Sequence, residues 1–130
     1  MGQIYDITWP LTPGMASWPG DEQYALRWLT LQSRGDTVNL SGLTMSPHLG
    51  THADAPFHCD GRQPTIDQVA LDAFVGPARL VDLRGRCAID VSDLAPYDWA
   101  ATPRLLLRTG AWDDGHHLPD PIPILAPDVP

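Results

Sequence analysis

The chain has 130 residues, of which 43% are hydrophobic, and it carries a formal net charge of −8 at pH 7. This length and apolar content suit one soluble globular domain and exclude a disordered tail. The acidic balance argues against nucleic acid or an anionic membrane as a partner, because either would repel the chain. Without a signal-peptide pattern or an apolar run near the roughly 18 residues of a membrane span, we expect a cytoplasmic protein.

Three stretches in the first third of the chain are rich in aromatic and branched residues and are separated by turn-forming residues. They predict β-strands over Gln3–Thr8, Tyr24–Leu31 and Val38–Met45. In the second stretch Tyr24, Leu26 and Trp28 alternate with smaller or polar residues. This period of two predicts a half-buried strand.

The next predicted element is a helix over Ile66–Val75. Thr65 and Gln68 have the spacing of a capping box, and Asp67 places a negative charge in the first turn. Gly76-Pro77 then provides a stop signal.

The remaining elements are shorter. Apolar runs predict buried strands over Ala78–Leu83 and Arg104–Arg108, with a short helix or turn at Val91–Leu94 between them. From Trp112 onward the many prolines predict a loop. With no internal repeat and no linker, we expect residues 1–130 to form a single domain.

Three imidazoles and one carboxylate gather within eleven residues: His48, His52, Asp54 and His58. All four occupy even positions, so an extended segment would direct them to one face. Neutral ring nitrogens and carboxylate oxygens together suit zinc, manganese or iron(II). Three protein ligands leave a coordination position open, which is typical of a catalytic metal site rather than a structural one.

The backbone around these residues is predicted to be irregular. Pro47 and Pro56 bracket the segment and Gly50 lies inside it, which disfavours a regular helix. We therefore expect the ligands on a strand end or a tight loop. Cys59 has an odd position that turns it away from the face shared by the even-numbered residues, so it is not expected to be a ligand. Two cysteines are too few for a disulfide scaffold, and a cytosolic chain would keep Cys59 and Cys87 reduced.

The pattern His-x-Gly-Thr-His-x-Asp-x-Pro-x-His over residues 48–58 resembles the signature of the metal-dependent cyclase family of amide hydrolases. Bacterial kynurenine formamidases are its best-known members. Upstream, the segment IYDITWPLTPGMASWPGD is similar to the family's opening and its substrate-side loop. Downstream, GPARLVDL and PRLLLRTG extend the resemblance to nearly the whole chain.

The resemblance implies a role for each site residue. His48, His52 and Asp54 would bind the first metal, and Asp54 would also bridge to a second. His58 would be the catalytic proton-transfer residue, and Trp18 would line the substrate pocket. The family implies two zinc ions per site, with manganese as the alternative.

The resemblance also implies an α/β swivelling fold, in which a mostly antiparallel, barrel-like sheet is flanked by helices, and a homodimer. Family members are longer, and a later His and Glu complete their second metal site. We therefore expect a family domain whose C-terminal part is missing. We do not expect His116 and His117 to replace those ligands, since nothing in their spacing directs them at Asp54.

The function implied is metal-dependent hydrolysis of an aryl formamide, which converts the small-molecule substrate N-formylkynurenine and water to kynurenine and formate. Two alternatives remain open at this point. A related hydrolase of the family would open a cyclic amide such as isatin. A non-catalytic metal-binding or assembly module would keep only the first-metal ligands.

Overall fold

A computed structural model describes residues 2–97, 102–112 and 114–129 of the chain. These residues cluster into two units. The first contains residues 1–53 and 114–118, and the second contains residues 54–113 and 119–130. Each unit is built on short strands and short helical turns, so the chain is a mixed α/β protein. The single domain predicted from the sequence stays a prediction.

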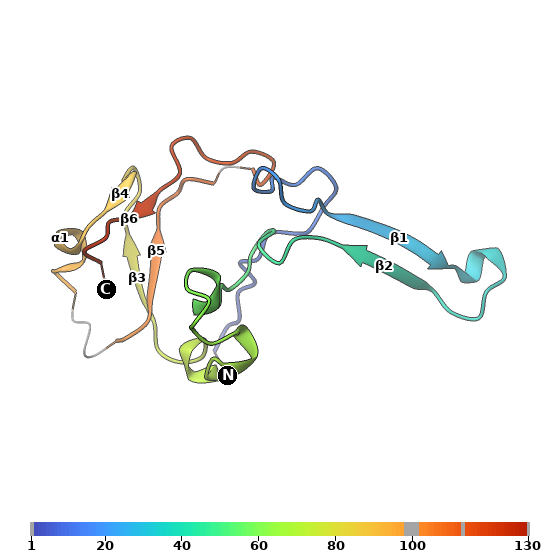
Figure 1. Cartoon of the computed structure of the whole chain (residues 1–130), viewed down its shortest axis with the longest axis horizontal. Coiled ribbons are helices and arrows are strands. Elements are labelled where there is room, and N and C mark those ends of the chain that lie inside the picture. Colours follow the sequence, from blue (N-terminus) through green and yellow to red (C-terminus); the bar gives the residue numbers. More distant parts are fainter. Residues whose placement is uncertain (1, 98–101, 113, 130) are drawn as a thin grey trace. The chain divides into compact units, whose positions relative to one another are not determined.

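The first unit is dominated by an antiparallel hairpin of β1 (Ala25–Thr30) and β2 (Leu40–Thr44), visible in Figure 1. Leu26 pairs with Leu43, and the 3-10 turn η1 (Gln32–Arg34) ends at Gly35, which has a φ of 92°. The strands predicted over Tyr24–Leu31 and Val38–Met45 are thus confirmed, each trimmed at its ends.

The predicted half-burial of the first of these strands is wrong. Leu26 and Trp28 are 45% and 49% exposed, and Leu43 on the opposite strand is exposed as well. The hairpin is a sheet of only two strands, so within the described residues it has no second layer to cover either face. Alternation in the sequence identified the strand but not what would bury it.

The strand predicted over Gln3–Thr8 is also wrong, because the described residues form no strand there. Ile4 and Ile7 are exposed, and the polar contacts are local: the backbone N–H and the hydroxyl of Thr8 both donate to Asp6 Oδ1. Branched residues favour a strand only where a neighbouring strand can pair with them.

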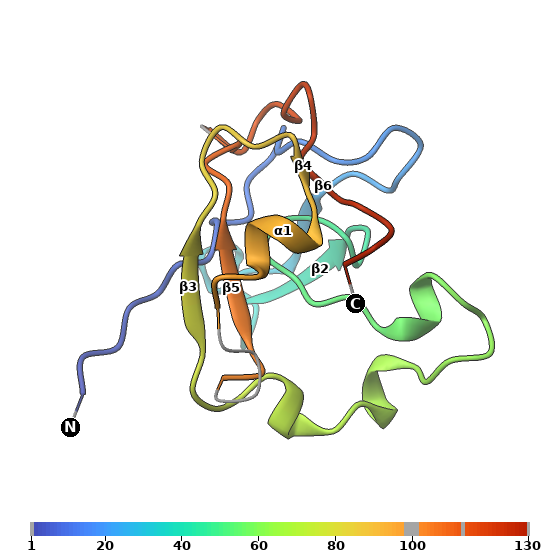
Figure 2. The same ribbon diagram turned by 90° about the vertical axis from the view of Figure 1, so that its left-hand side faces the viewer.

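The second unit contains two parallel pairs. β3 (Arg79–Asp82) pairs with β5 (Leu105–Arg108), and β4 (Ala88–Ile89) pairs with β6 (Ile124–Leu125). Figure 2 shows β3 and β5 side by side. Residues 83–104 connect them, long enough for the crossover that parallel strands require.

Several expectations about the fold need correction. The mostly antiparallel sheet is not found, since two of the three strand pairs are parallel, and the described residues form no closed barrel. β3 and β5 were expected to be buried, yet side chains on one face of β3 are exposed. The predicted loop after Trp112 is interrupted by β6.

The core of the second unit consists of Val81, Leu83, Ile89 and Leu94, all buried. Leu94 belongs to α1 (Val91–Leu94), which confirms the predicted short helix. The Asp90 side chain accepts hydrogen bonds from the backbone N–H groups at the start of α1. The pKa of the Asp90 carboxyl is lowered, chiefly by the hydrogen bond from the Ser92 side chain and then by the bonds from these N–H groups. The cap holds α1 in place to complete the core.

The predicted helix over Ile66–Val75 is replaced by two 3-10 turns, η3 (Ile66–Gln68) and η4 (Leu71–Ala73). The capping box of Thr65 and Gln68 forms as predicted. The backbone then becomes extended, with ψ of 130° at Val69 and 137° at the next residue. So short a helix has few hydrogen bonds to offset nucleation and depends on tertiary packing, and Leu71 is 78% exposed. None of the helices in the described ranges is long and apolar enough to cross a membrane.

Candidate metal centre

The first candidate ligand, His48, lies on a tight turn of the first unit. The turn closes where the backbone N–H of Leu49 donates to the Ser46 carbonyl oxygen at 3.2 Å, with Pro47 at its second position. The Ser46 N–H donates to the carbonyl of Glu22, and the Leu49 side chain is buried. This anchoring on both sides fixes the backbone that carries the half-buried His48.

Gly50 follows this turn and has a φ of +70°. A β-carbon here would lie 2.9 Å from Leu11 Cδ2 and 3.4 Å from Met15 Cε. Both the backbone conformation and the close packing therefore favour glycine.

The Gly50 carbonyl in turn orients His52, whose Nδ1 lies 2.8 Å from its oxygen. Because a carbonyl oxygen only accepts, Nδ1 carries the proton and Nε2 is the nitrogen able to bind a metal. The ring centroids of His48 and His52 lie 5.4 Å apart in an edge-to-face arrangement.

Asp54 lies two residues before a second tight turn, η2 (Pro56–His58), and His58 is the last residue of that turn. Proline suits the first position of such a turn, since its φ is already fixed and no N–H is needed there. The His58 N–H donates to the Ala55 carbonyl at 2.9 Å. Of the two settings expected for the candidate ligands, a strand end or a tight loop, the structure shows tight turns, and this turn brings His58 back towards Asp54.

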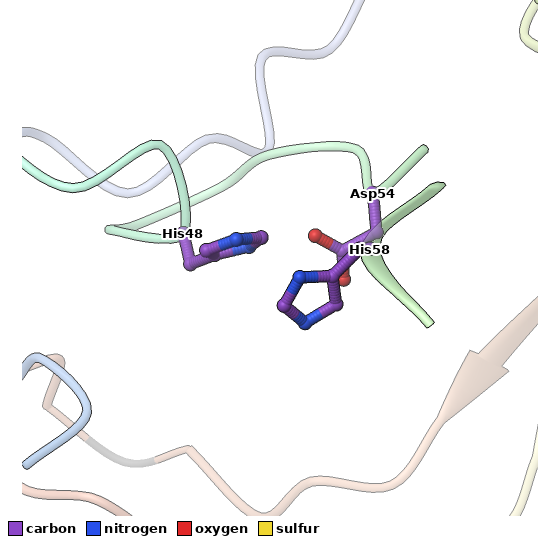
Figure 3. A group of neighbouring side chains, drawn as sticks. All are labelled: His48, Asp54 and His58. Atoms are coloured by element: carbon purple, nitrogen blue, oxygen red, sulfur yellow. The ribbon is translucent and has the colours of Figure 1, made fainter. Parts of the chain in front are cut away.

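Figure 3 shows the side chains of His48, Asp54 and His58 pointing toward one another. One ligand atom from each lies within 4.8 Å of the other two. Two ligands of one zinc ion, each about 2.0–2.2 Å from it, lie no more than about 4.4 Å apart. Only a small side-chain adjustment is needed for all three to reach one ion, and two imidazoles with a carboxylate are suitable donors.

The structure thus brings together three of the four clustered residues predicted from the sequence. His52 is outside this group, although its ring packs against that of His48. His58, to which the family resemblance gives the proton-transfer role, lies inside it. The assignment of a metal or catalytic role to each residue stays a prediction.

Trp18 lies on a β-turn of the first unit. The Asp21 N–H donates to the Trp18 carbonyl at 3.0 Å, and Gly20 at the third position has a φ of +96°. A proline at the second position and a positive φ at the third define a type II turn, the conformation that Pro19-Gly20 favours. The Trp18 side chain is 59% exposed, so most of its indole surface is available for contact.

His116 and His117 make local contacts instead. The Nδ1 of His116 lies 3.1 Å from the Gly14 carbonyl oxygen, and the Nδ1 of His117 lies 3.0 Å from Asp114 Oδ2. The pKa of Asp114 is lowered, chiefly by the hydrogen bond from the His116 N–H and then by the bond from the His117 side chain. Among the described residues neither histidine belongs to the metal-binding group. Cys59 and Cys87 are both exposed and form no disulfide with each other among the described residues.

Two polar residues near the candidate ligands were missed from the sequence. The Ser46 hydroxyl donates to Asp21 Oδ2 at 2.8 Å and accepts from the His48 N–H at 3.2 Å. A serine hydroxyl often accepts a hydrogen bond from the backbone N–H two residues later, so the sequence holds a local signal for the bond from the His48 N–H to Ser46. The bond to Asp21 joins residues far apart in sequence and has no local signal.

The comparisons with known proteins identify the family of the chain. Residues 5–127 match the family model Cyclase, described as "Putative cyclase". The chain belongs to the cyclase family. This match spans the turn that carries Trp18 and all four clustered residues.

Among curated proteins, the chain is similar to proteins named kynurenine formamidase. It is 36% identical over 124 residues to that of Bacillus cytotoxicus, covering 95% of this chain and 59% of the relative. With the Geobacillus thermodenitrificans protein the identity is 35% over 129 residues, 99% of this chain and 62% of the relative. The chain therefore spans about three fifths of the length of these relatives.

Proposed function

We propose that the protein to which this chain belongs hydrolyses an aryl formamide, N-formylkynurenine, to kynurenine and formate. The observation that carries this proposal is the convergence of His48, Asp54 and His58 within 4.8 Å, in a segment that matches the cyclase family. Relatives named kynurenine formamidase indicate the substrate.

The metal ligands in this proposal are His48, His52 and Asp54. The hydrogen bond from His52 Nδ1 to the Gly50 carbonyl supports this role, because histidines that bind metals usually donate their other ring N–H to a carbonyl or carboxylate. The donors fit zinc, with manganese as the alternative, and a second ion would share Asp54. When bound, such an ion lowers the pKa of its water and polarises a carbonyl group.

His58 is the proposed proton carrier. It lies within 4.8 Å of His48 and Asp54, where it can reach a water molecule that these residues also approach. An imidazole can both accept and donate a proton near neutral pH, so one histidine can serve as the base and then as the acid. His58 takes a proton from the attacking water while the hydroxide adds to the formyl carbon. It returns that proton to the aryl nitrogen as the C–N bond breaks, so that a neutral amine and formic acid leave, and the formic acid then loses its proton to water to give formate.

Trp18 is the proposed substrate contact. Its indole is mostly exposed on a rigid type II turn, and a flat aromatic face can stack on the aryl ring of the substrate. We also infer that the complete protein forms the swivelling fold of the family, with a barrel-like sheet, and acts as a homodimer.

The test compares His58→Ala with His52→Ala in the full-length protein. If the proposed roles are right, His58→Ala retains zinc and loses turnover, whereas His52→Ala loses both. His117→Ala is the matched control, since this exposed histidine lies outside the group and should change neither property. Equal loss of zinc in the first two variants would make His58 a ligand and refute its role in proton transfer.

A further inference from the structure

The hydroxyl group of Ser46 lies between the Trp18 turn and the backbone of His48. Among the described residues Ser46 is the only polar side chain that is buried, with 6% of its surface exposed. A buried hydroxyl costs free energy unless its hydrogen-bonding capacity is used. Ser46 uses it in both directions, because it donates to the Asp21 carboxylate and accepts from the His48 N–H.

These two bonds join two turns that are separate in sequence. Asp21 closes the type II turn that presents Trp18, and His48 lies at the third position of the turn that begins at Ser46. The Ser46 N–H reinforces the link by donating to the carbonyl of Glu22, the residue after Asp21. The Trp18 turn and the backbone of a candidate metal ligand are therefore connected through one side chain.

We propose that Ser46 is a positioning residue that couples the Trp18 turn to His48. The inference rests on the proposed function, in which Trp18 contacts the substrate and His48 binds the metal. Ser46 touches neither the substrate nor the metal in this scheme. It fixes the Asp21 carboxylate on one side and the His48 backbone on the other, so that a shift of either turn is transmitted to the other.

The consequence is a reciprocal coupling. If metal binding at His48 favours the conformation in which Trp18 is held for the substrate, an aryl ligand must favour metal binding by the same factor. Mutation of residues that hydrogen-bond to metal ligands without touching the metal typically weakens metal affinity by about 10–100-fold. Loss of the Ser46 hydroxyl should therefore weaken zinc binding by about tenfold or more.

The experiment uses the full-length protein and three variants: Ser46→Ala, Ser46→Thr and the control Ser41→Ala. Zinc affinity is measured by competition with a chelator, with and without saturating kynurenine. Ser46→Ala should bind zinc about tenfold more weakly and lose the effect of kynurenine. With zinc saturating, its KM should rise while kcat is kept, the pattern expected when ground-state and transition-state binding weaken together. Ser46→Thr keeps the hydroxyl and should restore wild-type values, and Ser41→Ala, which removes an exposed hydroxyl from β2, should match the wild type.

Unchanged zinc affinity in Ser46→Ala, or failure of Ser46→Thr to restore it, would overturn the inference. If circular dichroism shows Ser46→Ala to be unfolded, Asp21→Ala replaces it, since this variant removes the acceptor and leaves the hydroxyl. Zinc affinity requires no turnover, so a wild-type protein that binds zinc without hydrolysing formamides would refute the proposed function and still test Ser46. A wild-type protein that binds no zinc would overturn both.

Discussion

Substitution of Gly50 by alanine tests how the ligand loop is held. A residue with a β-carbon at a φ of +70° costs about 1–2 kcal/mol of folding free energy. The new β-carbon would also lie 2.9 Å from Leu11 Cδ2, which is too close for van der Waals contact. Leu11 is 39% exposed and can rotate away, so this overlap adds about 1 kcal/mol, the lower end of the range for overpacking. The expected destabilisation is about 2–3 kcal/mol.

Gly35→Ala is the matched control for this prediction. Gly35 also has a positive φ, 92°, but a β-carbon there would meet nothing within 4 Å. This variant should show the backbone cost alone, about 1–2 kcal/mol, and it lies on the hairpin away from the ligand loop. Urea denaturation of both variants measures the two losses side by side.

Zinc titration supplies a second measurement for the same pair. The Gly50 carbonyl holds the His52 ring, so Gly50→Ala should also weaken zinc binding, whereas Gly35→Ala should leave it unchanged. Equal destabilisation in the two variants would refute the close contact with Leu11. A Gly50→Ala variant as stable as the wild type would refute the left-handed conformation itself.

Three further predictions concern the core, the cap of α1 and the metal. Leu94→Ala should lower the free energy of unfolding by about 2–5 kcal/mol, measured by urea denaturation, because Leu94 is 1% exposed and packs in one cluster with Val81 and Ile89. The pKa of Asp90 is lowered in the folded chain, so its stabilising effect is present above the ordinary carboxyl pKa of 3.8 and is lost as the pH falls through the lowered value. Thermal melts should therefore show Asp90→Asn less stable than wild type at pH 7, with the difference shrinking as the pH falls below 3.8 and through the lowered pKa of Asp90. A chelator should abolish formamide hydrolysis by the full-length protein, and added zinc should restore it.

Each of these predictions has a contrasting variant or result. Val91→Ala, on the exposed side of α1, should cost much less than Leu94→Ala, and equal costs would refute the packing described. A pH-independent difference for Asp90→Asn would exclude the charged cap as its cause. Hydrolysis that survives complete removal of metal would contradict the proposed function.

The sequence predicted those elements whose signals are local. Alternation of Leu26 and Trp28 identified β1, and the proline and glycine residues around His48 predicted a tight loop rather than a helix. The ligand cluster was visible because its members are close in sequence. Three of its members also lie close together in space.

The features that the sequence missed depend on distant partners. β4 and β6 are two residues each, too short for any periodicity, and exist because Ala88 pairs with Ile124. The capping box at Thr65 was read correctly, but its helix stops after one turn. A cap satisfies the first N–H groups of a helix and does not determine its length. The Ser46–Asp21 bond has the same origin, since only the folded chain brings the two residues together.

The placement of the candidate ligands in one short segment has a consequence for the order of folding. His48, Asp54 and His58 are separated by at most ten positions, and a loop of about ten residues closes in roughly 10–100 ns. The strands β3 and β5 are separated in sequence by residues 83–104, so their pairing closes a much longer loop. Contacts between residues far apart in sequence form more slowly. In the proposed function, the segment that would hold the ion can therefore close locally, without waiting for the long connection between β3 and β5.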